Sequence, residues 1–458
     1  MKKEYIEAFE SLIKEFAQVY KAQGIIVGIL DDKDLLYQRS FGYRNVEKEQ
    51  PIDENTIFGI ASITKSFTVI RLMQLAEAGL IDLETPLDEL YEDWQLPKEH
   101  TPKIKHLMSH VAGFYPQERF LMKDVADELG LEASALHESL ELSKRGIDMI
   151  IARLNQSKLF IGPPGEYFSY SNFSFGILTD LVERFSDESS YAASVMNHII
   201  KPMGLEHTFF DFERTKNESN ITRLYTAEKD GVKVTDDYMD AGFVLLGGGA
   251  IKSTLKDLLT YTRLYLNDGV VNDVRILEKA SVDAMMQERI VYKDGQGYGY
   301  ALVTGDLDDM RYVGHSGGLT GVSSFFGFNK TSGKGVVVLC NTGGVPATAI
   351  GMAALRLAHD LYPDYKTFNY VDGIWSDDAI QKTLGTYISK EGDHAEVVLR
   401  EGQVKIIANG VLKDCRTIRD DLMLIVSEME ESQCRILRNS EDEVYALYLG
   451  SRIIPKVG

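Results

Sequence analysis

The chain has 458 residues, of which 44% are hydrophobic and 26% are charged, a composition typical of soluble globular proteins with two or three domains. Its formal net charge of −20 argues against a nucleic-acid partner and against docking on anionic membranes. The three cysteines, Cys340, Cys415 and Cys434, form neither a disulfide framework nor a metal-binding spacing. We expect no metal and no other cofactor.

The N-terminal sequence MKKEYIEAFESLIKEF carries charges but lacks the apolar core of about 7–15 residues that a secretory signal needs. No segment approaches the roughly 18 apolar residues that a membrane-spanning helix requires. These two observations predict a cytoplasmic protein without a membrane span.

The first predicted elements are a helix and a hairpin. Apolar side chains recur at helical spacing over residues 3–22, which predicts an amphipathic surface helix. The runs GIIVGILD (24–31) and LLYQRSFGY (35–43) are β-like, and the charged residues between them predict a tight turn.

A helix-rich middle follows. The pattern is helical from Ser62 to about Ala78, and Gly79 then ends the helix, as a C-terminal glycine does. A further helical insertion is expected around residues 120–155.

The chain then returns to β-like runs and a last helix. We expect these elements at 296–303, 311–314, 321–329, 335–341 and, for the helix, 347–361. Because strands lie at both ends and helices in the middle, one sheet is expected to be built from both ends, with a helical domain inserted between them. This predicts a first domain over residues 1–365, with a helical subdomain at about 75–290.

The composition shifts near residue 384. The alternating runs AEVVLREG, VKIIANG, LMLIVSE, CRILRN and EVYALYLG are separated by glycine and charged turns. They predict a small antiparallel β-barrel domain over residues 384–458, joined to the first domain by a linker at 366–383.

The motif Ser-x-x-Lys occurs at least three times, at Ser62–Lys65, Ser11–Lys14 and Ser253–Lys256. A serine hydroxyl is a poor nucleophile without an adjacent base, and a lysine three residues on lies on the same helix face. The Ser11 pair falls inside the predicted surface helix, so its match is interpreted as accidental. The motif alone does not distinguish between Ser62–Lys65 and Ser253–Lys256.

Two further motifs follow Ser62 in order, Tyr170-Ser171-Asn172 and His315-Ser316-Gly317. Ser62 is predicted at a helix N-terminus, where free N–H groups favour negative charge. Tyr170 follows a Pro-Pro-Gly turn and is expected on a loop. His315 is expected to start a glycine-rich turn at a strand edge.

The three motifs together suit nucleophilic catalysis. Either Lys65 or Tyr170 could accept the Ser62 proton, and the sequence leaves both assignments open. The Asn172 amide could hold a substrate carbonyl and help to position Lys65. The N–H groups of Ser62 and Gly318 are the candidate donors to an oxyanion.

The ordered set Ser-x-x-Lys, Tyr-x-Asn and His-x-Gly resembles the serine β-lactamase/penicillin-binding-protein superfamily, in particular its class C-like branch of esterases and D-amino-acid peptidases. The phrases GLIDLETPLDELY, IKHLMSHVAGF, PPGEYFSYSNFSFGIL, GGGAIKSTLKDLLTY and GHSGGLTGVSS also support the resemblance. It implies an α+β fold, an antiparallel sheet flanked by helices with an inserted helical domain. It also implies that Ser62 is the nucleophile, that Ser253–Lys256 is structural, and that the C-terminal barrel is lipocalin-like.

One residue departs from the pattern of many β-lactamases and transpeptidases, which carry lysine where this chain has His315. An imidazole is mostly neutral near pH 7 and would grip a substrate carboxylate less firmly than an ammonium. The resemblance assigns Asn172, His315, Gly317 and Gly318 to substrate binding or the oxyanion hole. Tyr298 and Tyr300 have two equal interpretations, lining the substrate site or packing.

These observations favour a serine hydrolase that acts through an acyl-enzyme on esters or short peptide and amide substrates, including D-configured ones. The alternatives are a penicillin-binding protein or β-lactamase, and a catalytically silent ligand-binding protein. His106 and His110 lie one helical turn apart but lack a third ligand in the sequence, so no metal site is expected. Homo-oligomerisation stays open.

Overall fold

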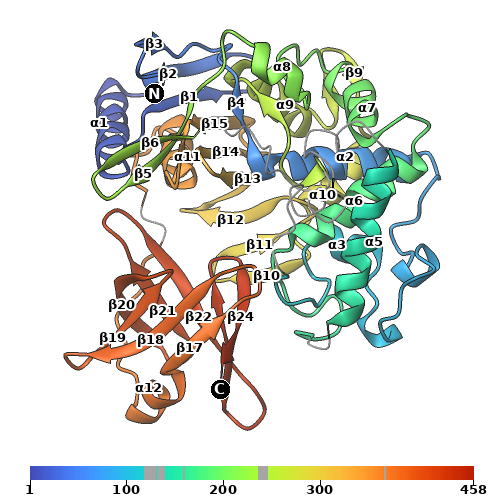
Figure 1. The fold of residues 1–458 in the computed structure, drawn as a ribbon. Helices are drawn as coiled ribbons and strands as arrows, with labels where there is room; N and C mark the ends of the chain where they lie inside the picture. Colours follow the sequence, from blue (N-terminus) through green and yellow to red (C-terminus); the bar gives the residue numbers. More distant parts are fainter. Residues whose placement is uncertain (118–129, 131–139, 158–159, 236–245, 366–367, 458) are drawn as a thin grey trace. The chain divides into compact units, whose positions relative to one another are not determined.

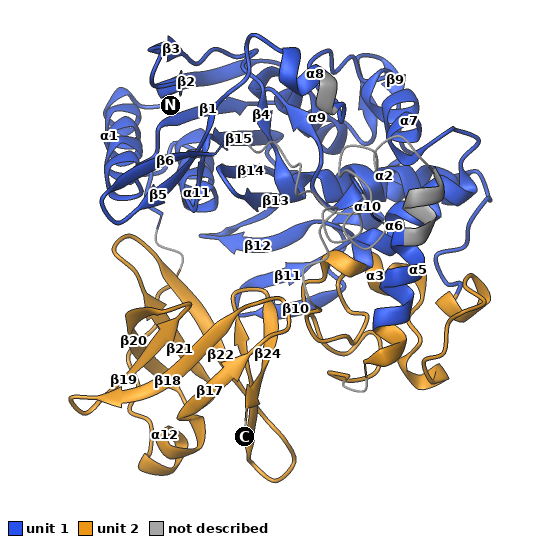
Figure 2. Cartoon of the chain, viewed as in Figure 1, with its two compact units in different colours: residues 1–85, 120–153, 174–365 blue, residues 86–119, 154–173, 366–458 orange. Residues whose placement is uncertain are grey.

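The computed structural model describes residues 1–117, 130, 140–157, 160–235, 246–365 and 368–457. The chain divides into two compact units (Figure 2). Unit 1 comprises residues 1–85, 120–153 and 174–365, and unit 2 comprises 86–119, 154–173 and 366–458. Within 120–153, only 130 and 140–153 are described.

Unit 1 is built on a nine-stranded antiparallel sheet (Figure 1). In spatial order its strands are β10 (Ile290–Lys293), β11 (Gln296–Tyr298), β12 (Val303–Leu307), β13 (Met310–Leu319), β14 (Val322–Asn329), β15 (Lys334–Cys340), β1 (Gly24–Leu30), β2 (Leu35–Asn45) and β3 (Gln50–Pro51). Strand β1 pairs with β15, with Ile25 opposite Cys340. The sheet is therefore completed by strands from both ends of this part of the chain, as the sequence predicts.

Short strands form smaller sheets beside it. They are β16 (Thr342–Gly343) with β5 (Leu224–Glu228) and β6 (Gly231–Thr235), β4 (Phe58–Gly59) with β7 (Lys252–Ser253), and β8 (Val270–Val271) with β9 (Val274–Arg275).

The described α-helices agree with the expected helix-rich middle. They are α1 (Lys3–Val19), α2 (Thr64–Glu77), α3 (Ile104–Met108), α5 (Leu140–Gln156), α6 (Asn172–Phe185), α7 (Tyr191–Val195), α8 (Phe212–Asn217), α9 (Leu255–Leu266), α10 (Lys279–Met286), α11 (Ala347–Ala358) and α12 (Asp377–Thr383). Short 3-10 turns are η1 (Ala61–Ile63), η2 (Leu87–Glu89), η3 (Lys98–His100) and η6 (Leu246–Gly248), and η5 (Met196–Ile200) is a π-turn. Of the insertion expected around residues 120–155, residues 120–129 and 131–139 lie outside the described residues.

Both faces of the central sheet are covered, because every residue of β1 and β14 is buried. Gly28 faces α9, where an added Cβ would meet the Leu255 side chain at 3.0 Å. On the opposite face Phe325 packs against α11, where an added Cβ on Gly351 would meet its ring at 2.2 Å. Small residues at these two positions let the helices approach the sheet closely.

The stretch 296–303, expected as one strand, is two strands with a turn at 299–302. The turn lies against the end of α10, because the Tyr300 N–H donates to the Met285 carbonyl at 3.0 Å. Gly299 makes this approach feasible, since a Cβ there would lie 2.2 Å from the same Met285 oxygen. Tertiary packing therefore interrupts the strand.

Residues 385–457 form a closed eight-stranded barrel, which confirms the β-barrel predicted for this region. Its strands are β17 (Gly385–Ile388), β18 (His394–Arg400), β19 (Gln403–Ala408), β20 (Val411–Arg419), β21 (Leu422–Val426), β22 (Glu431–Arg438), β23 (Val444–Leu449) and β24 (Arg452–Val457). The sequence runs did not reveal β17, β20 and β24. Pairing of β17 with β24 closes the barrel.

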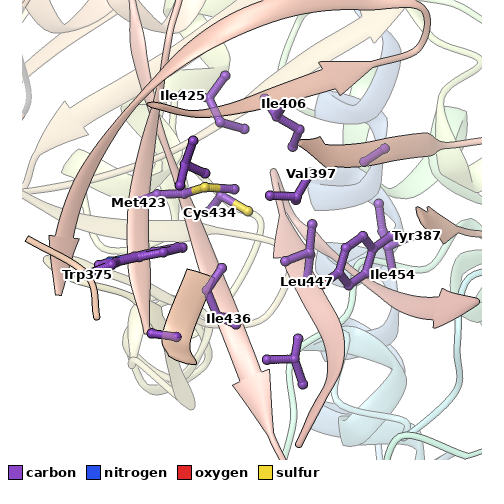
Figure 3. Close-up of a cluster of buried hydrophobic side chains, with 14 residues drawn as sticks. Trp375, Tyr387, Val397, Ile406, Met423, Ile425, Cys434, Ile436, Leu447 and Ile454 are labelled. Carbon is purple, nitrogen blue, oxygen red and sulfur yellow. The ribbon is translucent and has the colours of Figure 1, made fainter. Parts of the chain in front are cut away.

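Apolar side chains fill the barrel interior (Figure 3). Tyr387, Ile406 and Leu447 are fully buried there. Helix α12 lies within the segment expected as a linker, and its Ala379 belongs to the same core. An eight-stranded barrel is narrow enough for its own side chains to fill it.

We predict that Ile406→Ala lowers the free energy of unfolding of the barrel by about 2–5 kcal/mol, because it leaves a cavity in a closely packed core. The check is the denaturation midpoint of Trp375 fluorescence in a Trp94→Phe background, since these are the two tryptophans of the chain. Leu399→Ala removes a side chain that is 43% exposed and is the matched control. Equal losses in both variants would contradict the packing described here.

Candidate active site

Ser62 lies in the η1 turn directly before helix α2, close to the predicted helix start. The preceding residue, Ala61, has φ of +47°, a conformation that costs a non-glycine residue energy. The Ile60 backbone fixes this turn: its N–H donates to the Ile251 carbonyl at 3.1 Å, and its carbonyl accepts from Ser324 Oγ at 2.8 Å. The position of Ser62 is therefore set by the sheet and by the segment around Ile251.

Lys65 is fully buried on the first turn of α2. Its Nζ donates to Ser62 Oγ at 3.1 Å and to the Gly248 carbonyl at 2.6 Å. The same nitrogen lies 5.3 Å from the centre of the Phe175 ring. The spacing of three residues thus places the amine against the hydroxyl, as predicted.

The Gly248 carbonyl was not anticipated from the sequence, although it lies in the phrase GGGAIKS. The η6 turn that carries it is anchored by two threonines. Thr68 Oγ1 donates to the Gly247 carbonyl at 2.8 Å, and the Gly247 N–H donates to Thr179 Oγ1 at 3.1 Å. A Cβ on Gly247 would lie 2.4 Å from Thr179 Oγ1, so glycine is needed at this position.

The third motif lies beside the Ser62 turn. Gly317 is on β13, and a Cβ there would lie 2.2 Å from the Ile60 carbonyl oxygen and 3.0 Å from Ala61 Cβ. The strand can approach the turn only because Gly317 has no side chain. At Gly318 an added Cβ would meet no heavy atom within 4 Å.

The expectation that His315 starts a turn is wrong, because it lies within β13 and is only 3% exposed. Its Nδ1 lies 2.6 Å from the Ser316 carbonyl, so Nδ1 carries the proton, and Nε2 accepts from the Tyr298 hydroxyl at 3.0 Å. Burial, followed by the charge of Lys65, lowers the pKa of His315 to about 3. Tyr298 and Tyr300 are both buried, which favours the packing interpretation for them.

The second motif belongs to unit 2. Tyr170 lies on a loop, as expected, and α6 begins at Asn172. His110 supports this loop: its carbonyl accepts from the Ser169 N–H at 2.9 Å, and its Nδ1 accepts from the Ser171 N–H at 3.1 Å. The His110 and Tyr170 rings are 4.1 Å apart.

The structure therefore brings Ser62, Lys65 and Gly317 together in unit 1. It holds Tyr170 and Asn172 in unit 2, where Asn172 Nδ2 donates to Glu391 of the barrel at 3.2 Å. The pairing of Tyr170 with Lys65 stays a prediction from the sequence.

The other two Ser-x-x-Lys matches have different surroundings. Ser11 and Lys14 are exposed on α1. Ser253 is fully buried on β7, where its hydroxyl pairs with Thr208 Oγ1 at 2.8 Å, and Lys256 is exposed. These surroundings agree with the accidental and structural interpretations.

A sequence profile of the family described as Beta-lactamase matches residues 9–360. The chain belongs to the Beta-lactamase family. The match covers the motifs of Ser62, Tyr170 and His315, and the closed barrel that follows fits the expected lipocalin-like domain.

Three relatives illustrate the breadth of the similarity. Penicillin-binding protein 4* of Bacillus subtilis is 23% identical over 71% of this chain and 69% of its own length. The octameric penicillin-binding protein homologue from Pyrococcus abyssi is 25% identical with a TM-score of 0.69, covering 98% of this chain and all of that one. A D-stereospecific amidohydrolase from Streptomyces sp. is 20% identical with a TM-score of 0.58, covering 76% of this chain and 97% of that one.

Within the described residues, no helix has the length and apolar character needed to cross a membrane. Cys340, Cys415 and Cys434 are all free thiols, and Cys340 and Cys434 are buried.

We predict that Gly317→Ala reduces turnover of an ester substrate by about 10²-fold, because the new methyl group pushes β13 away from the turn that holds Ser62. Gly318→Ala keeps the backbone N–H and adds its methyl group to open space, so it should lose no more than a few-fold. The measurement is kcat/KM for both variants, with melting temperatures to confirm folding. A more harmful Gly318→Ala would refute this description of β13.

Because the pKa of His315 is lower in the folded protein than its usual value of 6.5, the native state favours the neutral ring. The stability from this preference is complete above about pH 6.5 and declines as the pH falls toward 3, by about 1.4 kcal/mol per unit. The stability difference between wild type and His315→Gln should therefore shrink by roughly 2 kcal/mol from pH 7 to pH 5.

The measurement is the free energy of unfolding of both proteins at the two pH values. His394→Gln, which changes an exposed barrel histidine, is the control. A constant difference between wild type and His315→Gln would mean that His315 takes up a proton in the folded state.

Proposed function

We propose that this chain is a serine hydrolase that forms an acyl-enzyme with esters or short amide and peptide substrates, including D-configured ones. The observation that carries the proposal is the 3.1 Å contact between the fully buried Lys65 amine and Ser62 Oγ. The contact places the amine within hydrogen-bond reach of the hydroxyl proton, which is the geometry that a general base requires.

In the proposed reaction Ser62 Oγ attacks the substrate carbonyl carbon, and its proton passes to Lys65 Nζ or to the oxygen of Tyr170 in its phenolate form. The oxyanion that forms is stabilised by the N–H groups of Ser62 and Gly318. Collapse of this intermediate expels the alcohol or amine, which takes up the proton. Water then attacks the acyl-enzyme, releases the acid and restores the Ser62 hydroxyl.

Two features support esters and amides over penicillins. The neutral, buried His315 replaces the lysine of many β-lactamases, and its ring nitrogens already bond to Tyr298 and Ser316. It therefore supplies no charged donor to a substrate carboxylate. The Streptomyces neighbour, named as a D-stereospecific amidohydrolase, agrees with an amide substrate.

The two alternatives predict different behaviour. A penicillin-binding protein, as the Bacillus subtilis relative is named, would be acylated by benzylpenicillin. A silent binding protein would react with no acylating reagent. The silent binding protein has less support for two reasons. A binding role gives no reason to bury a lysine amine against a serine. Within the described residues, the barrel interior is filled by apolar side chains, which leaves it no space for a ligand.

We predict that a fluorophosphonate labels the wild type once, at Ser62, and that Ser62→Ala loses about 10³-fold or more of its ester hydrolysis. The measurements are intact-protein mass spectrometry with peptide mapping, and kcat/KM for p-nitrophenyl acyl esters. Ser11→Ala is a matched control, because Ser11 begins another Ser-x-x-Lys motif on the exposed face of α1.

D- and L-aminoacyl p-nitroanilides and benzylpenicillin complete the substrate panel. Wild-type turnover by Ser62→Ala would refute the nucleophile. Faster turnover of benzylpenicillin than of every ester and amide would favour the first alternative.

The similarity to an octameric homologue supports a further proposal, that this chain also assembles into homo-oligomers. Sedimentation velocity over a range of protein concentrations measures this, and a mass of 51.4 kDa at all concentrations would contradict it.

A further inference from the structure

The part of the barrel where β23 leads into β24 contacts the loop that carries Tyr170. The Tyr170 N–H donates to the Ser451 carbonyl at 2.8 Å, and the Ile453 N–H contacts Ser169 Oγ at 3.4 Å. Arg452 lies between these two backbone contacts. Backbone groups at the start of β24 therefore hold the loop of the second motif. These contacts do not depend on the side chains of Ser451 and Ile453.

The side chains add a second set of contacts. Glu391, on the turn between β17 and β18, accepts bonds from Arg452 Nε and from its terminal nitrogen, the latter at 3.0 Å. The same carboxylate accepts from Asn172 Nδ2 at 3.2 Å. The Arg452 guanidinium lies 5.2 Å from the centre of the Tyr170 ring. One ion pair thus contacts both functional side chains of the second motif.

Burial restricts the orientations that the Glu391 and Arg452 side chains can adopt. The Glu391 side chain is 8% exposed and that of Arg452 is 24% exposed. Two parallel bonds to a guanidinium fix the plane of a carboxylate. An ionised carboxylate only accepts hydrogen bonds, so the Asn172 amide must present its nitrogen, and not its oxygen, to Glu391.

The orientation of the amide then determines what Asn172 can do. Its Oδ1 is buried, and no donor from the described part of the chain bonds to it. The sequence-based expectation that Asn172 helps to position Lys65 requires this oxygen, because an amine donates to an acceptor. A flipped amide would place its oxygen against the Glu391 carboxylate, which would repel it, and would leave only its nitrogen for any other contact.

We propose that Glu391 and Arg452 are positioning residues for the second motif, and that the barrel thereby takes part in catalysis. Glu391 fixes the orientation of the Asn172 amide, while Arg452 holds Glu391 in place and packs over the Tyr170 ring. The proposal rests on the proposed function, since it requires Tyr170 and Asn172 to act in hydrolysis.

The test is a double-mutant cycle with Glu391→Gln and Asn172→Ala on a p-nitrophenyl ester. Glutamine has the shape of glutamate but can present either end of its amide, so it no longer dictates the orientation of Asn172. We expect Glu391→Gln to lower kcat about tenfold or more and to change KM less than threefold. In the Asn172→Ala background the same substitution should change kcat by less than about threefold, because the residue it acts through is absent.

Two controls separate positioning from stability. Glu428→Gln removes the charge of an exposed barrel glutamate and should leave kcat, KM and melting temperature unchanged. Arg452→Lys keeps the positive charge but lacks the planar fork, so it should reproduce the selective loss in kcat. It also serves as the test if Glu391→Gln does not fold.

An active wild type whose kcat is unaffected by Glu391→Gln, or in which the two substitutions multiply fully, overturns the positioning role alone. A folded wild type that hydrolyses no ester and takes up no fluorophosphonate overturns the proposed function as well. The two failures are therefore distinguishable.

Discussion

The buried amine of Lys65 is the constraint on which the rest of unit 1 depends. A polar nitrogen removed from water costs about 1–3 kcal/mol unless acceptors surround it. The Gly248 carbonyl and the Ser62 hydroxyl are two such acceptors, at 2.6 and 3.1 Å. Moving either group would cost the amine one of these two bonds, so the contact proposed to serve catalysis also stabilises the fold.

The two turns that contact the Lys65 amine are themselves held by close packing. The Gly248 turn is held by Thr68 and Thr179, and the Ser62 turn is pressed against β13 at Gly317. Glycines at these contacts allow backbones to approach where any side chain would collide. The sheet, covered on both faces, gives β13 a rigid base. Secondary structure thus supports Ser62 on more than one side.

Local patterns predicted much of this arrangement. Helical spacing located α1 and α2, and the spacing of Ser62 and Lys65 located their contact. The same reasoning misplaced His315, because the glycines of VGHSGGLTG resemble a turn. In the structure one of these glycines, Gly317, allows β13 to lie close to the Ser62 turn. This requirement comes from tertiary packing, which no local sequence pattern reveals.

Glu391 and Arg452 were unpredictable for a different reason. They lie more than 200 residues after Asn172, Glu391 on the turn between β17 and β18 and Arg452 at the start of β24. Only the pairing of β17 with β24 brings these two sites together. The contact therefore depends on closure of the barrel, which periodicity and composition do not specify.

The pairing of β1 with β15 has a consequence for synthesis on the ribosome. Ile25 needs Cys340 as its partner, so a central strand made early must wait for one made more than 300 residues later. At roughly 5–20 residues per second, translation leaves β1 without this neighbour for about 15–60 seconds. During that interval the nascent chain carries an entirely apolar segment, GIIVGIL, whose later burial in the sheet cannot yet be complete.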